Sequence, residues 1–149
     1  MATNPHPFPL TVVTLGVADV ARSAAFYAAL GLTRRMKATG NEVAFFDAGG
    51  VVLALYSWHL LAEDAATPDA PRPQAFRGMT LARNCKTDDE VDAVMAHALK
   101  IGATLLRPAS KTDYGGYRGY FADPDGHPWE AVRAPGMGFT DDGRLVLPE

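Results

Sequence analysis

Apolar residues gather in short runs along the chain, and these runs predict a regular succession of strands and helices. Leu10–Val17 is apolar and β-branched, which is typical of a buried strand. Asp19 is a suitable N-cap for a helix over Val20–Leu30, and Gly31 is the residue type that commonly follows a helix end. Three short strands are predicted next, at Thr33–Lys37, Val43–Ala48 and Val51–Tyr56, followed by a helical turn around Trp58–Ala62.

The same order of elements returns in the second half of the chain. Phe76–Cys85 predicts a strand, and Thr87 with Glu90 has the spacing of a capping box for a helix that ends near Ile101. Gly102 follows this helix as Gly31 follows the first one. Three more strands are predicted, at Ala103–Pro108, Tyr117–Ala122 and Pro128–Arg133.

The repeated order defines the fold class and the organisation of the chain. We predict an α+β protein made of two βαβββ modules, at about residues 10–57 and 76–133. A polar, proline-containing linker lies at about 63–75, and residues 134–149 form a C-terminal extension. The whole length of 149 residues fits a single domain.

Composition narrows the classes of partner and compartment. The formal net charge is −3 and no cluster of Lys and Arg stands out, so we expect no nucleic-acid partner. No apolar run is long enough to cross a bilayer, and the N-terminus lacks the pattern of a secretory signal, so we expect a cytoplasmic protein with no membrane partner. The single cysteine, Cys85, excludes an intrachain disulfide and a CxxC motif.

Two stretches of sequence carry a resemblance to a known family. They are Leu15–Tyr27 with Leu30–Leu32 in the first module, and Gly119–Glu130 in the second. Over about Leu10–Val132 the chain resembles the vicinal oxygen chelate superfamily, which includes glyoxalase I, extradiol dioxygenases and bleomycin-resistance proteins. The resemblance implies a curved mixed sheet, a half-barrel, around one cleft, and it implies a homodimer. It does not fix the activity, because the superfamily contains several chemistries.

Metal-using members of this superfamily place four ligands at equivalent points of the two modules. On this chain the positions fall on Val12, between Gly78 and Thr80, on Ala54 and on Glu130. Only Glu130 carries a good donor for a divalent ion, and catalytic metal sites usually need three protein ligands. We therefore expect no metal cofactor, with a divalent metal held by unrecognised ligands as the alternative.

Glu130 is the candidate catalytic residue. Strand alternation places it with Val132 on the cleft face, where apolar surroundings would raise its pKa unless a cation pairs with it. Arg83 is the nearest plausible cation if the strand register turns it toward the cleft, and Asn84 takes its place if the register moves by one residue. Glu130 would then act as a general base or accept a hydrogen bond from a ligand; alternatively it is a relic paired with Arg83 or a tyrosine.

Aromatic side chains supply the remaining candidate ligand-binding residues. They concentrate near strand ends and in the loop 111–119, which contains two adjacent glycines. Such a loop would suit a lid over a planar apolar ligand, or it would simply connect two strands of a hairpin. The ligand-binding residues that we predict are Tyr56, Trp58, Arg83, Asn84, Tyr114, Tyr117 and Glu130.

The leading functional hypothesis is a metal-independent binding protein for a small apolar or aromatic molecule, similar to the bleomycin-resistance branch. The alternative is an enzyme, either a lyase or isomerase or a dioxygenase-related member, that uses Glu130 as a base or metal ligand. A third hypothesis is an interaction module that pairs with another copy through a sheet edge or the C-terminal extension.

Overall fold

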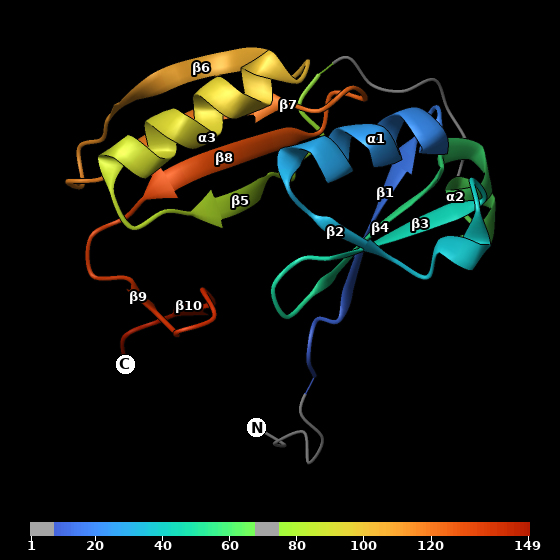
Figure 1. The fold of residues 1–149 in the computed structure, drawn as a ribbon, viewed down its shortest axis with the longest axis horizontal. Coiled ribbons are helices and arrows are strands. Elements are labelled where there is room, and N and C mark those ends of the chain that lie inside the picture. The colour runs from blue at the N-terminus through green and yellow to red at the C-terminus, as the bar shows by residue number, and fades with distance from the viewer. Residues whose placement is uncertain (1–7, 68–74) are drawn as a thin grey trace.

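The computed structural model describes residues 8–67 and 75–149, and it contains two similar halves (Figure 1). Each half has one long helix lying on one face of a four-stranded sheet. The first half comprises β1 (Val12–Val17), α1 (Val20–Leu30), β2 (Thr33–Arg35), a short 3₁₀ helix η1 (Lys37–Thr39), β3 (Val43–Asp47), β4 (Val52–Ser57) and α2 (Trp58–Asp64). The second half comprises β5 (Leu81–Asn84), α3 (Asp88–Lys100), β6 (Thr104–Lys111), β7 (Tyr117–Ala122), β8 (Pro128–Arg133) and the tail strands β9 (Gly138–Phe139) and β10 (Leu145–Val146).

The two sheets have the same topology. Sheet A has the order β1-β4-β3-β2, and sheet B has the corresponding order β5-β8-β7-β6. In each sheet the first strand pairs in parallel with the fourth, and the remaining pairs are antiparallel. The βαβββ order predicted from sequence is therefore confirmed for both halves. The two mixed sheets remain separate four-stranded units and do not close into a barrel.

Local signals fixed the ends of the first helix. The Asp19 side chain accepts a hydrogen bond from the Arg22 amide, and Gly31 adopts a left-handed φ of 118° that glycine tolerates without strain. The helix α1 therefore spans the predicted residues. In α3 the Thr87 hydroxyl accepts from the Glu90 amide, while the Glu90 carboxylate accepts from the amide of Lys86.

Several predicted strand limits are wrong. The strand expected over Phe76–Cys85 is only β5, because Gly78 has a φ of 80° and the side chain of Phe76 is exposed. Conversely, β6 continues to Lys111 rather than ending at Pro108. The helical turn after β4 is a two-turn helix, α2, and most of the expected linker, residues 68–74, lies outside the described residues.

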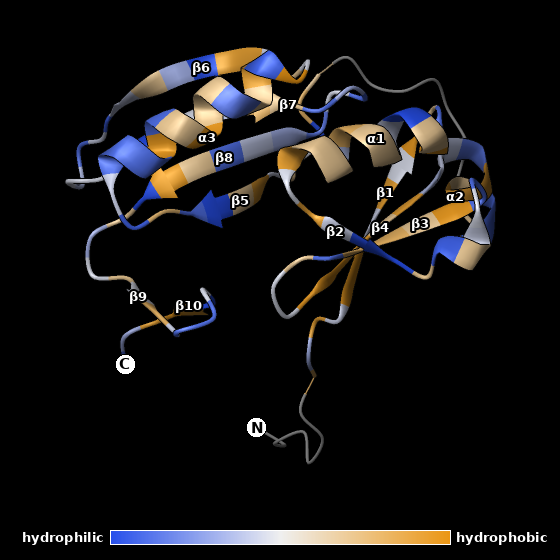
Figure 2. Ribbon diagram, in the orientation of Figure 1, coloured by the Kyte–Doolittle hydropathy of each residue, from blue (hydrophilic) through white to orange (hydrophobic). Residues whose placement is uncertain are grey.

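A single cluster of buried side chains includes residues of both halves. In Figure 2 the strands β1, β3 and β4 of sheet A are mainly hydrophobic, whereas α3 alternates hydrophilic and hydrophobic residues along its length. Tyr27 of α1 is fully buried at the centre, with its ring centroid 6.3 Å from that of Phe46 and 5.9 Å from that of Trp129. The Trp129 and Phe121 rings lie parallel, with their centroids 6.4 Å apart. Because these rings come from both halves, the halves share one core.

Each sheet consequently has a face toward its helix and a face away from it. On sheet B, Phe121, Trp129 and Ala131 belong to the core shared with α3, and a Cβ on Gly119 would meet Met95 of α3 at 3.0 Å. These residues define the helix face. Strand alternation puts the residues between them on the opposite side, which we call the open face of sheet B.

Candidate functional site

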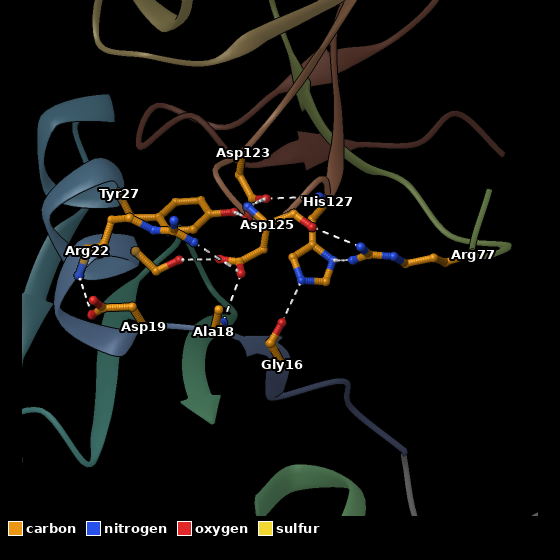
Figure 3. A network of polar contacts seen from close by, with 10 residues as sticks. Gly16, Ala18, Asp19, Arg22, Tyr27, Arg77, Asp123, Asp125 and His127 are labelled. Atoms are coloured by element: carbon orange, nitrogen blue, oxygen red, sulfur yellow. Dashed lines mark hydrogen bonds and ion pairs between the residues drawn. The ribbon is translucent and has the colours of Figure 1, made fainter. Parts of the chain in front are cut away.

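A buried polar cluster joins the β7–β8 turn to the first half (Figure 3). One oxygen of Asp123 accepts the Tyr27 hydroxyl at 2.7 Å, and the other accepts the amides of Asp125 and His127 at 2.9 and 2.8 Å. The Asp125 carboxylate accepts the Ala18 amide at 2.8 Å and the Ser23 hydroxyl at 3.2 Å. Burial and the acceptor role of the Asp123 carboxylate raise the pKa of Tyr27.

His127 in this cluster holds one defined tautomer. Its Nε2 lies 2.8 Å from the Gly16 carbonyl, which can only accept, so Nε2 carries the hydrogen. Its Nδ1 then accepts from Arg77 Nη1 at 3.1 Å. His127 and Asp123 are more than nine-tenths buried and are engaged by main-chain groups. The cluster therefore fastens the two halves together and presents no reactive group to a substrate.

The open face of sheet B carries a different polar group, formed by Glu130 of β8 and Tyr120 of β7. These two residues lie directly opposite each other in the antiparallel pair, where the Glu130 carboxylate acts on the Tyr120 phenol. Both side chains are half-buried. Burial and the negative charge of Glu130 raise the pKa of Tyr120, so the phenol stays protonated around neutral pH.

The side chains of Arg118 and Tyr114 also affect the pKa of Tyr120. Arg118, two residues before Tyr120 on β7, partly offsets the rise of the Tyr120 pKa through its positive charge. Arg118 also donates to the Ser110 hydroxyl at 3.0 Å. Tyr114, in the loop before β7, interacts electrostatically with Tyr120 as well. The open face thus combines one carboxylate, one guanidinium and two phenols, and we call Tyr114, Arg118, Tyr120 and Glu130 the open-face group.

The surroundings of Glu130 do not fit a divalent metal ion. Its partner on β5 is Ala82, as Thr14 is the partner of Ala54 in sheet A, so the residue of the second half that corresponds to Val12 is Thr80, within the predicted range of Gly78 to Thr80. The methyl groups of Ala54 and Ala82 donate nothing to a metal, and Thr14 offers only a neutral hydroxyl. Within residues 8–67 and 75–149 no three His, Cys, Asp or Glu side chains gather in a group that could hold a metal ion.

The predicted pairing of Arg83 with Glu130 is wrong. Arg83 lies opposite Ala131 in the β5–β8 pair and therefore on the helix face, where its Nη2 contacts Glu90 of α3 at 3.0 Å. The alternative, in which Glu130 pairs with a tyrosine, agrees with the position of Tyr120 directly opposite Glu130 on β7. Asn84 is opposite Val132, which puts it on the open face with Glu130.

Tyr117 also points away from the open face, contrary to prediction. Its hydroxyl donates to Asp92 of α3 at 2.7 Å, and this contact raises the pKa of Tyr117. Tyr56 lies on sheet A, opposite Gly16, rather than beside Glu130. The Trp58 ring packs closely on Gly16, 3.0 Å from where a Cβ on that glycine would lie. The Arg77 guanidinium lies 5.3 Å from the centroid of the Trp58 ring.

The loop before β7, for which the sequence left a lid and a hairpin connection as alternatives, is a compact hairpin connection. Its two strands leave only residues 112–116 between them, and the Thr112 amide bonds to the Gly116 carbonyl at 3.0 Å. The Thr112 hydroxyl accepts the Gly116 amide at 2.8 Å. Tyr114 at the tip is 58% exposed and interacts electrostatically with Tyr120 of the open face.

Sequence reasoning missed Tyr120 and Arg118 as site residues. The signal was available, because Arg118 and Tyr120 alternate with the helix-facing Gly119 and Phe121 along β7. Without the register of β7 on β8, however, the sequence could not show that Tyr120 lies opposite Glu130.

Further evidence comes from similarity to known proteins. A sequence model of the Glyoxalase/Bleomycin resistance protein/Dioxygenase superfamily matches residues 10–131. The crystal structure of a glyoxalase-related enzyme from Fulvimarina pelagi is 35% identical, with a TM-score of 0.83 over 95% of this chain and 99% of that one. None of the helices in the described residues is long and apolar enough to span a membrane.

Two more distant structures share the fold. Lactoylglutathione lyase from Agrobacterium tumefaciens is 22% identical, with a TM-score of 0.64 over 87% of this chain and 96% of that one. TioX from Micromonospora sp. ML1 is 21% identical, with a TM-score of 0.57 over 85% of this chain and 98% of that one. With the family match over residues 10–131 and the two βαβββ halves, the chain belongs to the Glyoxalase/Bleomycin resistance protein/Dioxygenase superfamily.

Proposed function

We propose that this protein binds a small organic molecule on the open face of sheet B without the help of a metal ion. The observation that carries the proposal is the Glu130–Tyr120 pair, a half-buried carboxylate and phenol on an accessible sheet face beside Ala82. The donor chemistry around Glu130 offers no second metal ligand at the neighbouring strand positions.

The open-face group suits a ligand with an apolar body and a polar substituent. The Glu130 carboxylate has lone pairs that can accept a hydrogen bond from an N–H or O–H of the ligand. Ala82, which is exposed and lies opposite Glu130, provides apolar surface on the same face. Tyr114 at the hairpin tip offers an exposed ring for stacking against a planar ligand.

The proposal is tested by a ligand screen with a matched pair of variants. A panel of aromatic compounds and antibiotics is screened by thermal shift, and the affinity for each compound that stabilises the protein is measured by calorimetry. Glu130→Gln removes the charge-assisted hydrogen bond and should weaken binding about tenfold or more. Glu42→Gln, at an exposed carboxylate in the other half, should leave the affinity unchanged.

Elemental analysis of the freshly purified protein provides an independent test. A stoichiometric divalent metal that is lost in Glu130→Gln would refute the proposal and require a metalloenzyme. Binding that is equally strong in Glu130→Gln and in the parent protein would refute the assigned site.

A second candidate function is a metal-free lyase or isomerase, and the Glu130–Tyr120 pair is the observation that favours it. Glu130 would take a proton from the substrate, while the Tyr120 hydroxyl, held protonated by its raised pKa, would donate to a developing oxyanion. The similarity to a glyoxalase-related enzyme is compatible with this chemistry. Turnover that is lost in Glu130→Gln while ligand affinity is retained would select this function over simple binding.

A further inference from the structure

Two opposite charges lie unpaired on the open face of sheet B. Arg118 of β7 and Glu130 of β8 are diagonal neighbours in the antiparallel pair, because Arg118 lies opposite Val132 and Tyr120 lies opposite Glu130. Both residues are half-buried. Within the described part of the chain, neither forms an ion pair with the other or with a further side chain. A half-buried charge without a counter-charge is unfavourable, and a bound ligand can supply that counter-charge.

Strand register keeps these two charges apart. Diagonal neighbours on one face of an antiparallel pair are about 7–8 Å apart. The guanidinium of Arg118 contacts β6 on the other side, where its Nη1 donates to the hydroxyl of its register partner Ser110 at 3.0 Å. Besides burial, Glu130 raises and Arg118 lowers the pKa of Tyr120, so both charges act on the same phenol. The Tyr120 hydroxyl therefore lies in a polar region with a negative side and a positive side.

The hydrogen-bonding groups left on Arg118 and Glu130 are complementary. Nη1 of Arg118 is engaged by Ser110, whereas its Nε and Nη2 have no partner among residues 8–67 and 75–149. The Nε–H and one Nη2–H point in parallel from the same side of a guanidinium, and this fork matches the two oxygens of a carboxylate. An ionised Glu130 only accepts hydrogen bonds, which suits the three donors of an ammonium group.

A ligand that carries both charges can bridge a gap that the two side chains do not close. It adds one charge-assisted hydrogen bond of about 2.7–2.9 Å at each end, so Glu130 and Arg118 can both be paired without moving together. The apolar part of the ligand has an aromatic neighbour, because the exposed ring of Tyr114 lies near enough to Tyr120 to interact with it. A planar ring on the ligand could stack on Tyr114.

We propose that the ligand of the open-face group is a zwitterion, an aromatic amino acid or a close analogue, with its ammonium on Glu130 and its carboxylate on Nε and Nη2 of Arg118. This inference rests on the proposed function, since it names the ligand class of the same site. It goes further in assigning Arg118 a specific partner and in requiring both charges on one molecule. A ligand with only one charge would leave either Arg118 or Glu130 without a counter-charge.

The test compares L-phenylalanine with three analogues that share its phenylethyl body. The first, 2-phenylethylamine, lacks the carboxylate; the second, 3-phenylpropionate, lacks the ammonium; and the third, 2-phenylethanol, carries no charge. Affinities are measured by calorimetry at neutral pH. We expect L-phenylalanine to bind about tenfold more tightly than either singly charged analogue, because each truncation removes one charge-assisted hydrogen bond. The alcohol should bind most weakly of the four.

Two variants should show crossed effects. Arg118→Gln should remove the advantage of L-phenylalanine over 2-phenylethylamine and leave its advantage over 3-phenylpropionate. Glu130→Gln should do the reverse. An unchanged affinity of Arg118→Gln for 2-phenylethylamine also shows that the variant is folded. Arg83→Gln is the matched control, because it removes a guanidinium from the opposite face of the same sheet, and both advantages should persist in it.

The outcomes separate this inference from the proposed function. If 2-phenylethylamine or 2-phenylethanol binds as tightly as L-phenylalanine and loses affinity in Glu130→Gln, the open-face site stands and the zwitterionic class is wrong. If none of the four probes binds saturably, the zwitterionic class is likewise wrong, and the wider panel of aromatic compounds and antibiotics still decides the proposed function. If both advantages persist in Arg118→Gln, the carboxylate lies elsewhere and the assignment of Arg118 is refuted.

Discussion

Replacing Asp123 with alanine provides the most direct test of how the two halves are held together. The substitution removes the acceptor of three buried donors at once: the Tyr27 hydroxyl and the amides of Asp125 and His127. Leaving a buried donor without a partner costs about 1–3 kcal/mol. Simple addition over three donors would give roughly 3–9 kcal/mol, and water entering the space left by the carboxylate reduces that sum.

We therefore expect Asp123→Ala to lower the free energy of unfolding by about 3 kcal/mol or more, against a total of about 5–15 kcal/mol for a typical domain. For a chain of this length the same loss corresponds to a fall in melting temperature of roughly 6–12 °C. Urea unfolding followed by tryptophan fluorescence measures the free energy. An unchanged m-value would show that the variant still unfolds as one cooperative unit.

The first half offers a matched control at Asp47. This residue precedes the β3–β4 turn as Asp123 precedes the β7–β8 turn, but its side chain is 57% exposed and accepts only the Gly49 amide, at 3.3 Å, besides a 4.0 Å ion pair with Arg35. Asp47→Ala should cost about 0.5 kcal/mol or less, as surface changes usually do. The reasoning fails if Asp123→Ala and Asp47→Ala lower stability equally, or if Asp123→Ala costs less than about 1 kcal/mol.

Three further outcomes follow from particular residues. The pKa of Tyr27 is raised in the folded protein, so its contribution to stability is complete below the unfolded-state pKa of about 10 and is lost as the pH rises above it. Tyr27→Phe should therefore flatten the fall in unfolding free energy between about pH 10 and 11. An unchanged slope would contradict this. Burial raises the pKa of Cys85. In the folded protein its thiol should therefore react with iodoacetamide at pH 8 far more slowly than in the urea-unfolded protein. Equal rates would show that the thiol is accessible. Gly119→Ala should destabilise the protein by about 1–3 kcal/mol, because its Cβ would lie 3.0 Å from the Met95 side chain and 3.1 Å from a backbone nitrogen. Gly138→Ala, whose nearest neighbours would be 3.7 Å away, is the control, and both are measured by urea unfolding.

The sequence determined those features that depend on neighbouring residues in the chain. The helix α1 begins and ends where Asp19 and Gly31 predicted, because capping and a left-handed φ are local requirements. The βαβββ order could likewise be read twice from hydrophobic spacing and turn residues. Glu130 was recognised as the acidic residue at a potential metal position, since family resemblance supplied that position without any structure.

Only the tertiary structure decided which side chains meet. Whether Arg83 or Asn84 shares a face with Glu130 depends on the register of β5 on β8, and a shift of one residue exchanges the two faces. The contact of Tyr120 with Glu130 and the burial of Asp123 against Tyr27 both join residues far apart in the chain. Local propensity carries no information on such pairs, because they are stabilised by packing and desolvation that exist only once both sheets have formed.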